Sequence, residues 1–204
     1  MILVRLYVDD ILLIGSCSND IATFKKLLMN KFEMIDLENM TYFLGMKIMY
    51  YDKGIILHQL KYELELLKRF EPMNYKSTIT HAETNHKLDS DVEGDDVDAT
   101  IFKHLVGLLR YLCNTIPVIC YVVGMVSRFM NKPKWSNYQA ALRILRYVKG
   151  TLKYEVLILS GAKTESEMMC YSKSDWCEDR VVIRSTYGYL FKYLRGPISW
   201  CSKK

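Results

Sequence analysis

The chain has 204 residues, enough for one large domain or two small ones. Half of the residues are apolar and a quarter are charged, which is ordinary for a globular protein and argues against global disorder. The net charge of +5 is compatible with a polyanionic partner, but many proteins without a nucleic-acid role carry as much.

The cysteines and the apolar segments exclude further classes. The six cysteines form no C-x-x-C pair and have no histidine cluster beside them, so zinc is not expected and the thiols should be reduced. Charges interrupt the N-terminal apolar stretch, and Pro117 and Arg128 keep the apolar segment 116–130 shorter than a bilayer span. The sequence therefore predicts an intracellular protein, cytoplasmic or nuclear, that is not secreted and has no membrane partner.

The first third of the chain is predicted to alternate strands and helices. Two apolar runs on either side of Asp9-Asp10 predict a β-hairpin over residues 2–16. A helix should begin near residue 18, with Ser18 or Asn19 as N-cap and an apolar face at helical spacing. Next come three short strands, at residues 32–35, 42–49 and 55–58, and a helix over residues 60–70 that Pro72 ends.

The rest is predicted to be a linker, three helices and a final set of strands. Residues 71–99 show no clear period and hold six acids between Asp89 and Asp98, which is typical of a solvated linker; a regulatory or ion-binding role is the alternative. Helices should fill residues 101–150, with Pro117 opening the second and Gly150 following the third as a C′ residue. Four strands complete an α+β chain, at residues 154–159, 167–172, 186–193 and 198–201.

Asp9 and Asp10 are the main candidates for chemistry. Two carboxylates held close together repel unless a cation lies between them, and hard divalent ions such as Mg²⁺ prefer oxygen ligands. In two-metal nucleotidyl transfer, carboxylates bridge the ions, and a third acid normally comes from elsewhere. Taken alone, the pair favours the plainer interpretation, a polar hairpin turn, because Asp is common in turns.

The residues around this pair resemble a known family. Tyr7-Val8-Asp9-Asp10, with its apolar flanks, resembles the catalytic turn of reverse transcriptases. The rest of the chain resembles the Pol polyprotein of copia-type LTR retrotransposons, whose polymerase is RNA-directed. The resembling blocks keep the family's order over essentially the whole length: residues 32–37, 42–48, 56–62, 106–112, 127–133, 143–151, 184–189 and 198–204.

The resemblance implies roles for the N-terminal site residues. It implies that Asp9 and Asp10 are catalytic acids of the palm that bind Mg²⁺ or Mn²⁺, and that Tyr7 and Val8 lie beside the nucleotide and the primer end. It also implies a primer grip, formed by Tyr42, Phe43, Leu44 and Gly45. The missing Cβ of Gly45 would permit close backbone approach there, and an ordinary turn glycine is the alternative.

The resemblance also implies partners and a division of the chain. The palm would occupy residues 1–70, an acidic linker 71–99, a helical thumb 100–152 and a truncated start of a ribonuclease H-like domain 153–204. The implied partners are an RNA template and an RNA–DNA or DNA duplex. In the thumb, Arg143, Arg146 and Lys149 can face phosphates together, or they can form a solvated basic face at a helix end.

Departures from the family lead to an expectation of inactivity. The fingers and the earlier palm strand, which donates another metal-binding aspartate, have no counterpart in this sequence. Lys173 stands where the ribonuclease H part usually has an acid, so its ammonium would compete with metal at Asp175. Asn137-Tyr138 replaces a His-Trp pair. The chain alone is therefore expected to be catalytically incompetent. The alternatives are a subunit completed in trans and a non-enzymatic nucleic-acid-binding or interaction module; the oligomeric state is open.

Overall fold

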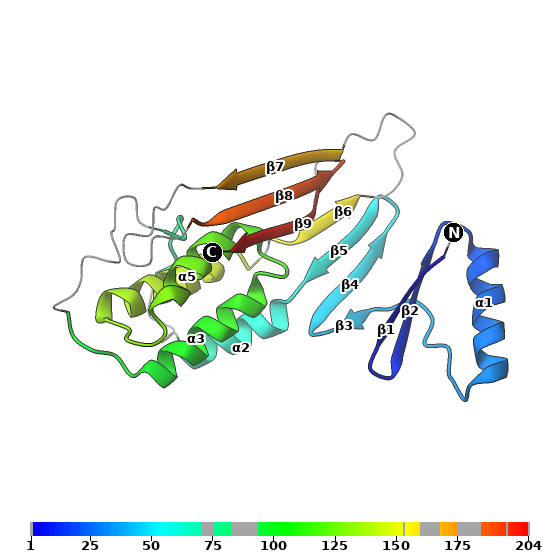
Figure 1. Cartoon of the computed structure of the whole chain (residues 1–204), viewed down its shortest axis with the longest axis horizontal. Helices are drawn as coiled ribbons and strands as arrows, with labels where there is room; N and C mark the ends of the chain where they lie inside the picture. Colours follow the sequence, from blue (N-terminus) through cyan, green and yellow to red (C-terminus); the bar gives the residue numbers. More distant parts are fainter. Residues whose placement is uncertain are drawn as a thin grey trace. The chain divides into compact units, whose positions relative to one another are not determined.

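The computed structural model describes residues 2–70, 76–82, 94–152, 154–159, 168–174, 185–194 and 196–203. It divides the chain into two compact units, residues 1–40 and 41–204, which are considered separately below. Helices and three antiparallel sheets occupy different stretches of the chain (Figure 1). This mixed architecture is compatible with the predicted α+β class.

The first unit is a hairpin followed by one helix: β1 (Ile2–Tyr7), β2 (Asp10–Gly15) and α1 (Ser18–Lys31). The hairpin was predicted. The predicted N-cap, Ser18 or Asn19, is wrong. Cys17 is the N-cap of α1, and its side chain makes no capping hydrogen bond. The strand predicted at residues 32–35 is wrong; this segment has no strand partner among the described residues. The predicted apolar face of α1 exists, but no residue of the helix is buried.

The second unit begins with a four-stranded sheet in the order β3-β4-β5-β6. Its strands are β3 (Tyr42–Phe43), β4 (Met46–Tyr51), β5 (Gly54–His58) and β6 (Val156–Leu159). The single strand predicted over residues 42–49 is interrupted, because Leu44 and Gly45 both have positive φ angles and form a two-residue turn. Positive φ at both central residues is the pattern of a type I′ hairpin turn. β6 joins this sheet from a distant part of the chain by pairing with β5.

Helices build the core of the second unit. They are α2 (Leu60–Phe70), α3 (Ala99–Leu112), α4 (Cys120–Val126) and α5 (Trp135–Gly150), with single 3₁₀ turns η2 (Pro117–Ile119) and η3 (Ser127–Phe129) around α4. Phe102, Leu105 and Leu109 of α3 are completely buried, as are Leu145 and Val148 of α5. The apolar residues whose helical spacing predicted these helices are therefore the residues that the helices bury in the core.

Two predicted helix ends differ from the structure. The second of the three predicted helices, which was expected to begin at Pro117, is only the short α4 with its flanking 3₁₀ turns. At its end the Ser127 hydroxyl donates to the carbonyl oxygen of Gly124, at 2.7 Å, and such a bond competes with the regular helical pattern. Gly150 is the last residue of α5 rather than the residue after it, and Thr151 is the C-cap.

A three-stranded sheet, β7 (Met168–Ser174), β8 (Tyr187–Tyr193) and β9 (Gly196–Lys203), closes the chain. β9 contacts α4 and β6, and the Trp200 indole N–H donates to the Cys113 carbonyl oxygen at 2.6 Å. The sheet is thereby fixed to the end of α3. Across the described ranges, the structure contains no helix with the length and apolarity that a bilayer crossing requires.

Candidate functional site

The hairpin of the first unit presents Asp9 and Asp10 at its tip. Val8 and Asp9 form the two-residue loop, and Asp10 opens β2 directly opposite Tyr7. The turn thus interrupts the strand alternation that would send two neighbouring side chains to opposite faces. Both carboxylates are exposed, and the Val8 side chain is 78% exposed, so a large ligand can reach the whole turn.

The backbone of this turn is strained. Val8 has a φ of 51°, a left-handed conformation that is unusual for a β-branched residue. Only the first central residue of the loop has positive φ, which is the sign pattern of a type II′ turn, where Gly is normally found. Strain of this kind concentrates at functional sites, because there the position of a side chain matters more than local stability.

The β3–β4 turn belongs to the second unit and is fixed from outside the sheet. The Tyr111 hydroxyl of α3 donates to the Leu44 carbonyl oxygen. A Cβ on Gly45 would collide with the same hydroxyl unless Tyr111 shifted, and the φ of 74° independently favours glycine here. Tyr111 also packs edge-on against Tyr62, whose pKa is raised by burial and then by Tyr111.

Sequence reasoning missed Tyr111, because nothing in its own helix shows that it reaches the turn. Gly45 was the residue that could have indicated this contact. A glycine in a tight turn often allows another group to approach its backbone closely. With Tyr111 in place, Tyr42, Phe43 and Leu44 are held on a short hairpin whose loop is tied to the helical core. Both Tyr42 and Leu44 are exposed.

Three basic residues of α5, called here the basic row, lie beside residues 76–82. Arg143, Arg146 and Lys149 are each half-buried. Residues 76–82 pack along this helix: the Arg143 guanidinium donates to the Thr80 hydroxyl at 2.9 Å, and the Thr78 amide donates to the Arg146 carbonyl oxygen at 3.2 Å. Part of the segment predicted as linker thus covers part of the row that was predicted to face phosphates.

Of the two remaining predicted site residues, the structure describes only Lys173, which belongs to β7. Lys173 is described, exposed, and paired with Gly188 of β8. Asp175 lies outside the described residues. Among the residues that the structure does describe, no group of three or more His, Cys, Asp or Glu side chains could hold a metal ion.

Comparisons with known proteins assign the chain to a family. Residues 1–83 match the family described as "Reverse transcriptase (RNA-dependent DNA polymerase)". An uncharacterised mitochondrial protein of Arabidopsis thaliana is 34% identical over 98% of this chain and 82% of its own length. The chain belongs to the retrotransposon reverse transcriptase family.

Other relatives in this family are much longer proteins. The Retrovirus-related Pol polyprotein from transposon RE1 of Arabidopsis thaliana is 35% identical over 97% of the chain but only 13% of the polyprotein. The corresponding polyprotein from transposon TNT 1-94 of Nicotiana tabacum is 34% identical over 99% of the chain and 16% of its own length. No solved structure matches the chain significantly.

The family match and the site geometry coincide in the N-terminal residues. Residues 1–83 include both the Val8–Asp10 turn and the β3–β4 turn. The basic row of α5 and Lys173 lie outside the family match, although the alignment with the uncharacterised mitochondrial relative extends over almost the whole chain. Asn137 has a structural role: its buried side chain accepts a hydrogen bond from the Lys134 amide, at 2.8 Å, and caps α5.

Proposed function

We propose that this chain is the part of a copia-type reverse transcriptase that carries the catalytic turn, the primer grip and the thumb. The observation that carries the proposal is the Tyr7–Asp10 turn, an exposed and strained hairpin tip inside the segment that matches the reverse transcriptase family. In this assignment residues 1–70 are palm, residues 100–152 are thumb, and the final sheet is the start of a ribonuclease H-like domain. RNA template and RNA–DNA or DNA duplex are the proposed partners.

Asp9 and Asp10 are the proposed ligands of a divalent ion. The family generally uses such ions, and Mg²⁺ is commonly bound through one or two carboxylates, with water and substrate phosphates completing its shell. Two exposed carboxylates at one turn fit this mode. A bound ion would stabilise negative charge on reacting phosphates. The protein's own contribution is to hold both carboxylates at a hairpin tip beside Tyr7 and Val8.

The primer grip and the thumb are proposed to hold nucleic acid. Leu44 and Gly45 bring backbone to the surface at a turn that Tyr111 fixes. Phosphate contacts would be added by Arg143, Arg146 and Lys149. Because these side chains are only half-buried beside residues 76–82, part of each stays accessible to a ligand.

These residues by themselves are proposed not to polymerise. The carboxylates of the described residues form no group of three, whereas two-metal transfer normally needs a third acid. A primer-extension assay with Mg²⁺ or Mn²⁺ tests this directly. Template-dependent synthesis by the isolated chain would overturn the inactivity, and synthesis only after a second polypeptide is added would favour completion in trans.

Metal binding can be tested without activity. Mn²⁺ should broaden the NMR signals of residues 7–10 selectively, and Asp9→Asn together with Asp10→Asn should abolish the effect. Asp52→Asn is the matched control, because Asp52 is an exposed aspartate in the loop between β4 and β5. Equal broadening in the control and the double variant would contradict a metal site at the turn.

A non-enzymatic nucleic-acid-binding module is the second candidate. It is favoured by the buried core of α2–α5, which gives the second unit a stable fold of its own. Binding of an RNA–DNA duplex that weakens steeply with salt, without any synthesis, would support it. Replacing Arg146 and Lys149 by Gln should lower the slope of log K against log salt by about one for each phosphate that is no longer neutralised.

A further inference from the structure

A large hollow lies within the second unit, between the β7–β8–β9 sheet and the helical side. Its volume is about 1260 Å³, and its lining comes from the sheet, from residues 115–121 and from residues 147–159. Drug-sized ligands occupy pockets of roughly 300–1,000 Å³, so this hollow is large enough for a longer ligand. The described residues that line it include none from the catalytic turn or the primer grip.

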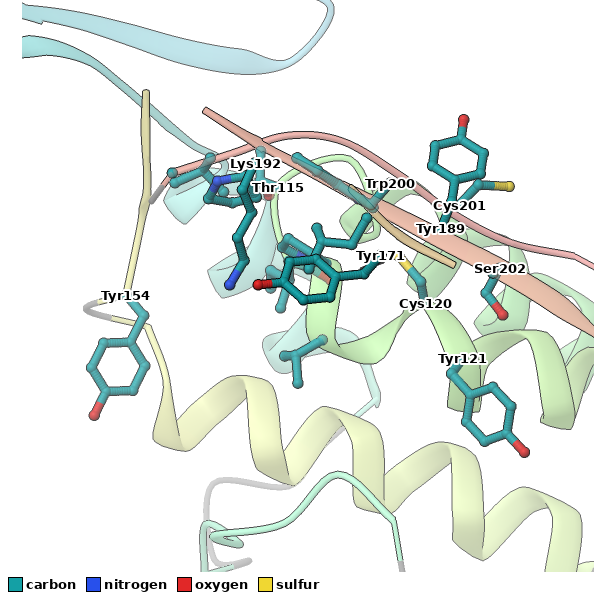
Figure 2. A pocket seen from close by; sticks show the side chains of 18 of the residues that line it. Thr115, Cys120, Tyr121, Tyr154, Tyr171, Tyr189, Lys192, Trp200, Cys201 and Ser202 are labelled. Carbon is teal, nitrogen blue, oxygen red and sulfur yellow. Dashed lines mark hydrogen bonds between the residues drawn. The ribbon is translucent and has the colours of Figure 1, made fainter. Parts of the chain in front are cut away.

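The strand register decides which side chains face the hollow. Tyr171 lies opposite Leu190, which lies opposite Trp200, so these three share one face of the sheet. Figure 2 shows Tyr171 and Lys192 projecting from the sheet towards the helices, whereas Tyr189 and Cys201 project to the other side. The hydrogen bond from Trp200 to the Cys113 carbonyl oxygen fixes this face to the end of α3.

Aromatic rings line the hollow but are not buried in it. Tyr171 is 52% exposed, and Tyr154, which precedes β6, is 75% exposed. Tyr121, from α4, is about half exposed and also lines the hollow. Rings that served only to fill a core would be covered, so these offer free faces to a ligand.

Two lysines accompany the rings. The Lys192 ammonium lies over the Tyr171 ring, 5.6 Å from its centre. Lys173, on the same face of the sheet, also lines the hollow, and Glu155 is the one acid among the described residues of its lining. Lysine is depleted in protein–protein interfaces, whereas aromatic rings beside cations are the usual platform for unpaired bases and their phosphates.

We propose that this hollow binds single-stranded nucleic acid, with bases stacked on Tyr171 and Tyr154 and phosphates near Lys192 and Lys173. The inference rests on the proposed function in taking nucleic acid as the ligand class, but it uses a different surface from the catalytic turn. The ring faces are sequence-tolerant, so binding should show little base preference. Lys173, which departs from the family's acid, acquires a role here.

Fluorescence anisotropy of a labelled oligonucleotide of about ten thymidines, titrated with the full chain, tests the proposal. Tyr171→Ala and Tyr154→Ala should each weaken binding roughly fivefold to a hundredfold, as expected for loss of one stacked base. Tyr171→Phe keeps the ring and should bind as the original chain does. Lys192→Gln should lower the dependence of log K on log salt by about 0.7.

Tyr51→Ala is the matched control. Tyr51 lies on β4, is 55% exposed, and has its hydroxyl near the sulfur of Met49, just as the Tyr171 hydroxyl lies near the sulfur of Met169. It does not line the hollow, so its loss should leave binding unchanged. Unfolding midpoints of all variants distinguish weaker oligonucleotide binding from a destabilised fold.

Three results would overturn the proposal. They are absence of oligonucleotide binding, equal weakening by Tyr51→Ala and Tyr171→Ala, and unchanged binding by Tyr171→Ala. Failure here is distinguishable from failure of the proposed function. Duplex binding through α5 and Mn²⁺ binding at Asp9 and Asp10 are tested with variants of residues that do not line the hollow. Their outcomes are therefore independent of the outcome here.

Discussion

Helices α1 and α3 each contain 14 residues and both carry an apolar face, but α1 buries none of its residues whereas α3 buries five. The five are Phe102, Leu105, Val106, Leu109 and Leu112. Residues 1–40 leave large apolar side chains exposed on the hairpin as well, including Leu3 and Leu6. Periodicity thus identifies a face that can be buried, and the presence of a partner decides whether it is.

The buried core that stabilises the fold and the residues proposed for catalysis therefore lie in different units of the chain. The second unit holds the helical core, while the proposed catalytic turn lies in the unit with little burial of its own. Apolar side chains gathered at the surface in this way are typical of a surface that binds other polypeptide.

The largest effect should come from the core of α3. Leu109→Ala leaves a cavity at a completely buried position and should lower the free energy of unfolding by about 2–5 kcal/mol. Leu27→Ala makes the same change on α1, at an exposed position, and should cost less than about 0.5 kcal/mol. Urea unfolding followed by circular dichroism measures both. Similar losses in the two variants would erase the contrast between the helices.

The next effect concerns a carboxyl group at the edge of the same core. Burial, and then the charge of Glu155, raise the pKa of Glu63 on α2 to about 7, from 4.5 for an ordinary Glu. Between pH 4.5 and about 7, Glu63 therefore keeps its proton in the folded chain but has lost it in the unfolded chain. The free energy of unfolding falls as the pH rises through this range to about 7. Between pH 5 and 8 the loss should be about 2–3 kcal/mol.

Glu63→Gln should remove this pH dependence and be the more stable protein at pH 8. Glu65→Gln is the matched control, because Glu65 is exposed on the same helix. Unfolding midpoints measured from pH 5 to 8 distinguish the two. A slope unchanged by Glu63→Gln would show that another group titrates in this range.

Local patterns predicted most elements but not their partners. The hairpin, α2 and α3 follow from apolar spacing, turn residues and Pro or Asp signals within a few residues. The pairing of β6 with β5 joins segments about a hundred residues apart, and no local pattern encodes it. For the same reason, periodicity could not show that α1 stays exposed or that residues 76–82 lie along α5.

The site was predictable to a similar extent. The predicted hairpin forms, but its two-residue loop is Val8-Asp9, one residue earlier than the Asp9-Asp10 pair expected at the tip, and Asp10 begins β2. The strain at Val8 and the hydrogen bond from Tyr111 to Leu44 were not visible, since both depend on backbone geometry and on a helix far along the chain. The roles of these residues in catalysis stay predictions.

A smaller effect is expected where the final sheet meets the core. Trp200→Phe keeps the aromatic ring but removes the indole N–H that donates to the Cys113 carbonyl oxygen. The loss of one such bond should cost about 1–2 kcal/mol. Trp135→Phe is the control, because Trp135 is half exposed at the start of α5. Urea unfolding should show the loss in the first variant only, and equal effects would mean that ring size rather than the hydrogen bond matters.

A last effect should occur in the Val8–Asp10 turn, and its sign should be opposite to that of a regular strand position. Val8→Gly relieves a left-handed backbone that costs an L-residue about 1–2 kcal/mol, so amide hydrogen exchange in β1 and β2 should slow by roughly fivefold or more. Val4→Gly makes the same change within β1, where Val4 pairs with Leu13, and should speed exchange because glycine weakens a strand. Unchanged or faster exchange in Val8→Gly would show that the turn is not strained. Slower exchange in Val8→Gly alone would show that this unit, with little burial of its own, also gives up backbone stability to hold Asp9 and Asp10 at the hairpin tip.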